Sequence, residues 1–270
     1  MYAALLKHEA RLQTRPLLAY LGIALAVFAG GMALALLRIP AVSQIGALAT
    51  ISACVFLALS VPAGVLMRYY TSMYGREGYL THAIPAKHTT LYAAKFTWAL
   101  AVWLIALVVA IGMGVGFFVA QTVAYGGTVA DAWTSLTEAL AGLGTAPTIA
   151  LVGWCLIGVV IYVAQFGWIV TFGMEDRFRA LGVGGPVLVW FASYLVLQVL
   201  TIVAILLIPL GVSLDLSELV FTTFASELPK AFANEDPSFI PLGWLPLLLA
   251  TLPVYVVWTL RSLKKHTSLR

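Results

Sequence analysis

Six long apolar runs divide the chain, and shorter polar stretches separate them. The runs cover about residues 17–37, 46–67, 96–120, 148–172, 186–210 and 244–260. A helix of about 20 residues, rising about 1.5 Å per residue, crosses a hydrocarbon core of roughly 30 Å. Lipid admits only helices and closed barrels, and the runs lack the alternation of barrel strands. The pattern predicts an all-α integral membrane protein, with residues 1–270 as one transmembrane domain of six helices.

The composition agrees with a membrane protein. Of the 270 residues, 62% are hydrophobic and 10% are charged, whereas roughly 25% of an average soluble domain is charged. The net charge of +4 would favour a nucleic-acid partner in a soluble protein. In this chain the positions of the charges matter more than their sum, and we predict no nucleic-acid partner. Cys54 and Cys155 both fall inside apolar runs, which favours packing over a disulfide or a metal site.

Residues 1–15 have the pattern of an amphipathic helix. The apolar residues of one side are Tyr2, Leu5, Leu6 and Leu12, and the basic residues of the other are Lys7, His8, Arg11 and Arg15. We expect an interfacial helix whose basic face meets anionic headgroups. A frayed basic tail that only sets the topology is the alternative.

Two further connections are rich in acids or glycine. Residues 121–147 carry only acidic charges and predict a connection with one short helix. Residues 211–243 carry five acids against Lys230. Amphipathic pieces there, such as Leu214–Phe224, predict short helices resting on the membrane face.

The cations fall almost entirely on one side of the six predicted spans. Thirteen lie there: Lys7, Arg11, Arg15, Arg68, Arg76, Lys87, Lys95, Arg177, Arg179, Arg261, Lys264, Lys265 and Arg270. The other side has Arg38 and Lys230. Because cytoplasmic loops collect Lys and Arg, both termini, Arg68–Lys95 and Gly173–Gly185 are predicted to be cytoplasmic.

The lack of certain residue types argues against several mechanisms of transport and catalysis. No ionisable residue falls near the middle of a predicted span, which argues against ion-coupled carriers and intramembrane hydrolases. The chain has no GxxxxGK[ST] phosphate loop, so it is not expected to bind ATP itself. We therefore predict no enzyme activity, metal or cofactor in this chain, and any energy for transport must come from another subunit.

Gly112 and Gly116 in the third span form a GxxxG pattern that permits close approach of a second helix. Glycine is common in membrane helices, so ordinary packing within the chain is the favoured interpretation.

The longest polar interruption on the predicted cytoplasmic side is Tyr69–Lys95. Within it, the run Glu77–Thr81 followed by Ile84 and Pro85 resembles, in order and spacing, the stretch after the second span of ABC-2 type transporter permeases. The motif covers about a tenth of the chain, and the six-span layout, the N-terminal interfacial helix and the segment before the last span are also similar. The chain departs from the family pattern at His82, Ala83 and Ala86, which leaves the subfamily open.

The resemblance implies that this segment forms a short cytoplasmic coupling helix between spans 2 and 3, which docks into a groove of a separate ATP-binding subunit. The contact residues would be Arg76, Glu77, Gly78, Tyr79, Leu80 and Pro85. Tyr79 and Leu80 offer an apolar tip, and Arg76 and Glu77 would pair with polar groups around the groove. Without the resemblance, the aromatic residues would be taken as an interfacial belt and the Gly and Pro residues as loop formers.

The resemblance further implies two copies of the ATPase subunit, which would hold ATP and Mg, and a second permease chain, identical or related. Spans 1, 2 and 5 would line a substrate path between the two permeases. The function implied is export of a hydrophobic or amphipathic substrate, such as a drug, an antimicrobial peptide or a lipid, across a bacterial cytoplasmic membrane. A membrane scaffold or sensor that works with an ATPase without transport is the alternative.

Overall fold

The computed structural model describes residues 1–75, 77–214, 218–233 and 236–265, apart from the side chains at 82, 146, 179, 231 and 265. Within them, six helices are long and apolar enough to cross a membrane. They are α1 (Tyr2–Ala35), α2 (Pro40–Met73), α4 (His88–Ala124), α6 (Thr145–Gly173), α7 (Gly184–Leu207) and α9 (Trp244–Lys265). The sequence-based prediction of a helical, multi-pass membrane protein is confirmed at this level. The chain divides into two compact units, Met1–Val159 and Val160–Arg270, and the division falls inside α6.

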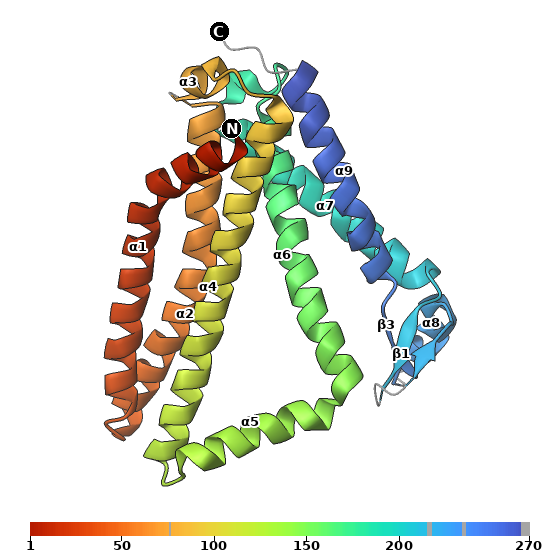
Figure 1. The fold of residues 1–270 in the computed structure, drawn as a ribbon. Helices are drawn as coiled ribbons and strands as arrows, with labels where there is room; N and C mark the ends of the chain where they lie inside the picture. Colours follow the sequence, from red (N-terminus) through yellow and green to blue (C-terminus); the bar gives the residue numbers. More distant parts are fainter. Residues whose placement is uncertain (76, 215–217, 234–235, 266–270) are drawn as a thin grey trace. The chain divides into compact units, whose positions relative to one another are not determined.

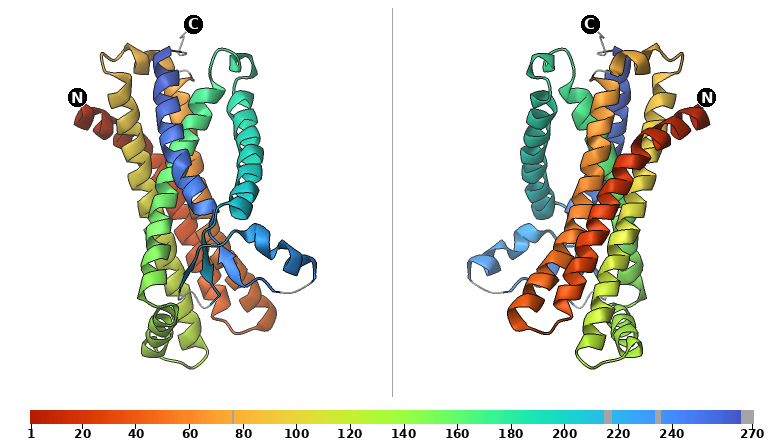
Figure 2. Two further views of the ribbon diagram at one scale, coloured as in Figure 1. Left: turned by 90° about the vertical axis from the view of Figure 1, so that its right-hand side faces the viewer. Right: turned by 90° about the vertical axis from the view of Figure 1, so that its left-hand side faces the viewer.

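In the first unit, α1, α2 and α4 run side by side (Figures 1 and 2). Small and branched apolar side chains fill the space between them, and the buried members are Ala24, Ala53, Leu57, Val61, Val102, Ala106 and Met113. Pro40 begins α2 at a position where its missing N–H costs no helical hydrogen bond. The three helices thus form a bundle with a continuous apolar core.

The interfacial helix predicted over residues 1–15 is not a separate element. It is continuous with the first predicted span in α1, and Pro16 lies inside that helix. A proline removes one backbone hydrogen bond, and α1 continues across this position. The N-terminal part of α1 bends away from the remainder (Figure 1).

The connection between α4 and α6 contains α5 (Val129–Leu143), which runs crosswise to α4 (Figure 1). A capping box fixes its start: the Thr128 hydroxyl accepts the Asp131 N–H at 3.1 Å, and the Asp131 carboxylate accepts the Thr128 N–H at 2.6 Å. These hydrogen bonds lower the pKa of the exposed Asp131 carboxyl, the backbone N–H of Thr128 most of all. The short helix predicted between the third and fourth spans is therefore present.

In the second unit, α7 is followed by a three-stranded antiparallel sheet in the order β2-β1-β3. The strands are β1 (Gly211–Ser213), β2 (Leu219–Val220) and β3 (Phe239–Pro241), and Val212 is opposite both Leu219 and Ile240. The short helices of this connection are η2 (Phe224–Glu227) and α8 (Leu228–Phe232), and η1 (Arg179–Leu181) precedes α7.

The prediction of a helix over Leu214–Phe224 is wrong. β2 lies in this range, and η2 only begins at Phe224, while residues 215–217 are outside the described part. Pairing with β1 satisfies the backbone groups of Leu219 and Val220 across the sheet. This tertiary pairing overrides the helical pattern of a short amphipathic stretch.

Glu227 holds the segment between α8 and β3 in place. Its carboxylate accepts the backbone N–H of Ser238 at 2.9 Å and the Ser238 hydroxyl at 2.8 Å, and it pairs with Lys230 at 3.1 Å. These contacts, led by the Ser238 N–H, lower the pKa of the Glu227 carboxyl. Residues that are eleven positions apart in the sequence are thereby joined.

Candidate functional site

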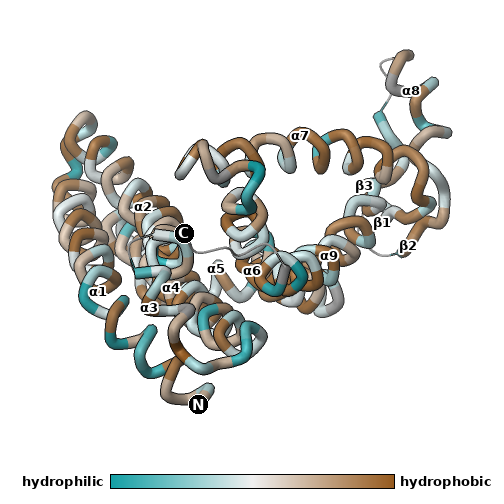
Figure 3. Tube along the Cα trace, turned by 90° about the horizontal axis from the view of Figure 1, so that it is seen from above, coloured by the Kyte–Doolittle hydropathy of each residue, from teal (hydrophilic) through white to brown (hydrophobic). Residues whose placement is uncertain are grey.

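The motif that resembles the permease family folds as α3 (Gly78–Ala83), a short helix between the end of α2 and the start of α4 (Figure 1). Tyr69 and Met73 are buried in the last turns of α2. The turn that follows is tight, because the Gly75 N–H bonds to the Tyr70 carbonyl at 3.1 Å and the Gly78 N–H bonds to the Gly75 carbonyl at 3.0 Å. Viewed from above, the first turns of α1 include hydrophilic residues (Figure 3).

An arginine on α2 holds the beginning of α3. Arg68 donates through Nη1 and Nη2 to the two carboxylate oxygens of Glu77, at 2.8 and 2.6 Å. This two-bond pairing fixes orientation as well as distance. The bonds from the Arg68 guanidinium lower the pKa of the Glu77 carboxyl below its ordinary value. Sequence analysis expected Glu77 to pair with a partner subunit, whereas here its carboxylate pairs inside the chain and positions α3.

The two apolar residues of α3 face outward. Tyr79 is 73% exposed and Leu80 is 69% exposed. Exposed apolar side chains scattered over a membrane protein contact lipid, but α3 is a short helix in a polar connection, where water would surround them. An exposed tyrosine such as Tyr79 is a typical anchor of a protein interface, and the adjacent Leu80 adds apolar area beside it.

The other predicted contact residues differ in their surroundings. Gly78 is buried at the start of α3, and Pro85 is exposed in the extended stretch that follows. Ile84, immediately before this proline, has an extended backbone with ψ near 126°, and α3 ends there. Arg76 lies outside the described residues. The structure thus brings Glu77, Tyr79 and Leu80 together on one short element, while Gly78 supports its base.

A buried polar cluster ties together the helices on either side of α3. Lys95 of α4 forms an ion pair with Glu9 of α1 and donates to the hydroxyl of Ser72 of α2 at 2.7 Å. Gln13, one turn after Glu9, donates to the second Glu9 oxygen at 3.0 Å. All four residues are at most 6% exposed. One ion pair with its two neutral partners therefore joins α1, α2 and α4.

Sequence analysis missed this cluster, which we call the Glu9–Lys95 cluster. It counted Lys95 among the cytoplasmic cations and gave Glu9 no role. One signal was available, because Glu9 is the only acid before Glu77 in the sequence. Gln13 stands four positions after it, so both side chains lie on one face of a helix. That face points into the bundle, whereas the basic residues of the same segment do not share it.

The glycine pattern predicted in the third span does not make a close helix contact in the described part of the chain. An added Cβ at Gly112 or Gly116 would meet no atom within 4 Å. The close approach occurs between α1 and α2 instead. There a Cβ on Gly31 would lie 2.8 Å from the Thr50 backbone nitrogen, and a Cβ on Gly46 would collide with the backbone of α1.

The described residues contain no group of three or more His, Cys, Asp or Glu side chains that could hold a metal ion. Around α3, the described residues present an exposed apolar pair, an ion pair at its base and a buried ion pair behind it. No family model, curated protein or solved structure compared with this chain matches it. The resemblance to ABC-2 type permeases accordingly rests on the Glu77–Pro85 motif and the layout of spans.

Proposed function

We propose that this chain is the membrane-spanning permease subunit of an ABC exporter, driven by a separate ATPase subunit that docks on α3. The observation that carries the proposal is the exposure of Tyr79 and Leu80 on a short helix between two spans, at the position of the permease motif. An apolar tip on a polar connection is stabilised when a partner covers it.

The contacts behind α3 supply a way to transmit motion. The Arg68–Glu77 pair joins α3 to α2, and the Glu9–Lys95 cluster joins α2 to α1 and α4. When two ATPase subunits close on ATP, force applied to α3 would reach three membrane helices through these polar contacts. Such a unit moves as a rigid body, which is one of the standard ways for proteins to switch between states.

The remaining parts of the proposal follow from the family layout and the charges. Two ATPase copies would carry ATP and Mg, and a second permease chain, identical or related, would complete the substrate path. Uncharged walls suit a hydrophobic or amphipathic substrate, such as a drug, an antimicrobial peptide or a lipid. The cation distribution favours both termini in the cytoplasm. The separation of permease and ATPase into different chains resembles the bacterial pattern, so the membrane would be a bacterial cytoplasmic membrane. Transport of a small charged substrate would contradict the proposed hydrophobic or amphipathic substrate class.

The docking step can be tested by gentle solubilisation from the native membrane and identification of the proteins that co-purify. Leu80→Asp places a charge on the apolar tip and should abolish retention of an ATPase with Walker motifs. Tyr125→Asp is the matched control, because Tyr125 is 81% exposed at the far end of α4. Absence of any such ATPase from the unmodified protein, or its retention by Leu80→Asp, would refute docking on α3.

A scaffold or sensor would also dock an ATPase on α3, but it would not move a substrate across the membrane. Sealed vesicles containing the permease and its ATPase distinguish the two. ATP-dependent movement of an amphipathic substrate supports the exporter. ATP hydrolysis without movement of any substrate tested favours the scaffold.

A further inference from the structure

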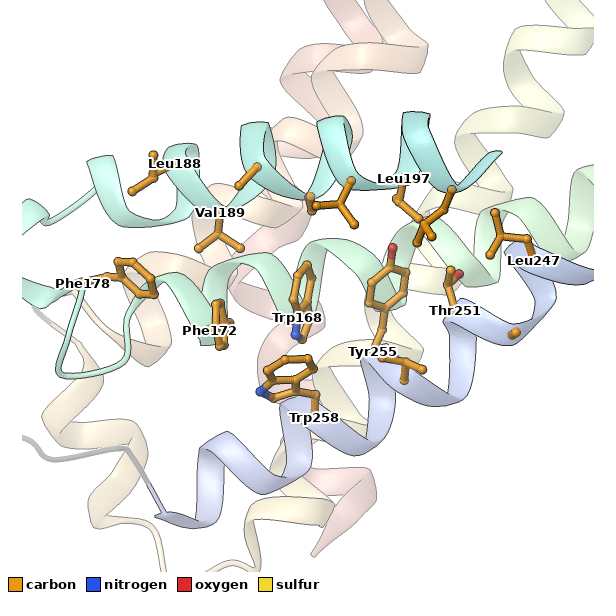
Figure 4. Close-up of a pocket in the computed structure, with 16 residues that line it drawn as sticks. Trp168, Phe172, Phe178, Leu188, Val189, Leu197, Leu247, Thr251, Tyr255 and Trp258 are labelled. Carbon is orange, nitrogen blue, oxygen red and sulfur yellow. The ribbon is translucent and has the colours of Figure 1, made fainter. Parts of the chain in front are cut away.

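The second unit contains an apolar groove of about 680 Å³ between the C-terminal part of α6, α7 and α9. Aromatic residues form one wall: Trp168 and Phe172 on α6 contact Tyr255 and Trp258 on α9, with ring centroids 5.1–5.8 Å apart (Figure 4). Aliphatic side chains of α7, from Leu188 to Leu200, form the other. The groove is therefore shaped for a long apolar group.

Two of the hydroxyl groups along the groove donate to backbone carbonyls. Ser193 donates to the Trp190 carbonyl at 2.8 Å, and Thr251 donates to the Leu248 carbonyl at 2.6 Å. A polar ligand would gain little from them and would lose its own hydration. A hydrocarbon chain has no such cost.

The length of the groove matches one leaflet of a bilayer. Leu188 and Leu200 on α7 are separated by twelve residues, which is roughly 18 Å along a helix. Half of the hydrocarbon core is roughly 15 Å. A single acyl chain of a lipid can therefore lie along the groove while its headgroup stays at the membrane surface.

An arginine stands at one end of the groove. The Arg177 guanidinium lies 5.0 Å from the ring centre of Phe172 and 5.7 Å from that of Phe178, and both rings line the groove. Its hydrogen bonds to Glu175 use Nε and Nη2. Arginine has five N–H donors, so the N–H groups of Nη1 can reach a second anion. The Arg177 side chain is 61% exposed, which gives a headgroup access to it.

The charges at the two ends of the groove differ in sign. At the end near Arg177, the described side chains of the segment after α6 and of the C-terminal turns of α9 include the cations Arg177, Arg261 and Lys264, against Glu175 and Asp176. At the other end, the described part of the connection between α7 and α9 carries the acids Glu218, Glu227 and Asp236 against Lys230. An amphiphile with a negative headgroup is therefore oriented with that group beside Arg177.

We propose that this groove binds an anionic phospholipid of the surrounding leaflet, with one acyl chain along α7 and α9 and the phosphate beside Arg177. The site needs only the second unit and a bilayer, so lipid binding can be measured without an ATPase and without transport. The proposal predicts that the protein binds a phospholipid in the membrane and prefers a negatively charged headgroup.

The test is native mass spectrometry of the full chain in detergent, titrated with dioleoyl phosphatidylglycerol or with dioleoyl phosphatidylcholine. The unmodified protein should bind the anionic lipid more tightly. Arg177→Gln should weaken binding of phosphatidylglycerol about fivefold, because one cation near a membrane surface contributes about that much, and should leave phosphatidylcholine unchanged. Arg38→Gln, which removes an exposed arginine of the first unit, is the matched control and should change neither.

A second variant tests the groove itself. Val196 lines it and is 57% exposed, so Val196→Trp should fold and fill the space, and binding of both lipids should fall. Ala192→Leu is a milder replacement if the first variant elutes as an aggregate. Equal binding of the two lipids by the unmodified protein, or a loss in Arg38→Gln equal to that in Arg177→Gln, would overturn the proposal. Undiminished binding by a folded groove variant would also overturn it.

Discussion

In the first unit a buried ion pair joins three helices in addition to their apolar core, whereas in the second unit three helices meet around aromatic rings and an apolar groove. Lys95 and Glu9 hold α4 to α1 through charge. Trp168 and Tyr255 hold α6 to α9 through ring contact. A buried ion pair tolerates little displacement, because separating its members leaves two charges without partners. Apolar contacts can slide with a smaller loss. This difference agrees with our proposals that the first unit transmits force and that the second binds a lipid.

The largest effect is expected from Lys95→Met. This change leaves Glu9 charged, buried and without its cation, which costs about 3–5 kcal/mol for a typical buried pair. Thermal unfolding of the purified protein in one detergent measures the loss. The double variant Glu9→Gln/Lys95→Met should recover most of the stability, because it removes both charges. A double variant no more stable than Lys95→Met would contradict the pairing.

A smaller loss should follow from Gly46→Val at the crossing of α1 and α2. A Cβ there collides with backbone atoms of Ala35 and Gly31, which cannot move as a flexible side chain would. Overpacking of this kind costs about 1–3 kcal/mol, and the same unfolding assay measures it. Gly112→Ala is the control: its Cβ meets open space, so it should be neutral or stabilising. Equal losses in the two variants would show that the crossing is not close.

Removal of an aromatic ring from the second unit should be tolerated comparatively well. Trp258→Ala loses ring contacts with Trp168 and Phe172, together worth about 1–3 kcal/mol. Trp258 is 42% exposed, so lipid or detergent can fill the space and the additional cost of a closed cavity does not arise. Trp258→Phe keeps an aromatic face and should retain more stability than Trp258→Ala in the same assay. A loss larger than that of Lys95→Met would reverse the comparison between the units.

The smallest effect on stability is expected at the Arg68–Glu77 pair, which is partly exposed and contributes at most about 1 kcal/mol. The pKa of Glu77 in the folded chain lies below its ordinary value of 4.5. The stabilisation is therefore complete above pH 4.5 and is lost as the pH falls through the lowered pKa. Hydrogen exchange of the amides of α3 should rise at such low pH, after correction for intrinsic rates.

Glu77→Gln should show faster exchange in α3 already at neutral pH and little further dependence on acid. Glu138→Gln is the control, because Glu138 lies on α5, away from α3. Unchanged exchange in Glu77→Gln would mean that the pair does not hold α3.

The membrane spans could be predicted from the sequence because each is a run of about 20 apolar residues. The contacts between individual side chains could not be predicted in this way. Lys95 and Glu9 are 86 positions apart. Lys95 was counted only as a cytoplasmic cation, and Glu9 was given no role. The close approach of α1 and α2 was missed because it depends on Gly31 and Gly46, which lie on two different helices. A GxxxG pattern describes two glycines on the same helix. The strands between α7 and α9 have two or three residues each, too few to show a period of two.

The groove beside Arg177 was also beyond sequence analysis. Its aromatic wall comes from two helices that are about 90 residues apart in the sequence, and each of them alone looks like an ordinary span. The position of α3 was predicted because the permease motif places it, but the pairing of Glu77 within the chain depends on the register between α2 and α3.

The most direct test of the proposed function is site-specific photo-crosslinking in native membranes, with a photoreactive amino acid at position Leu80 and, as control, at Tyr125. Both residues are exposed. We expect an adduct with an ATPase bearing Walker motifs from position 80 and none from position 125. No ATPase adduct from position 80, or equal adducts from both positions, would contradict docking on α3.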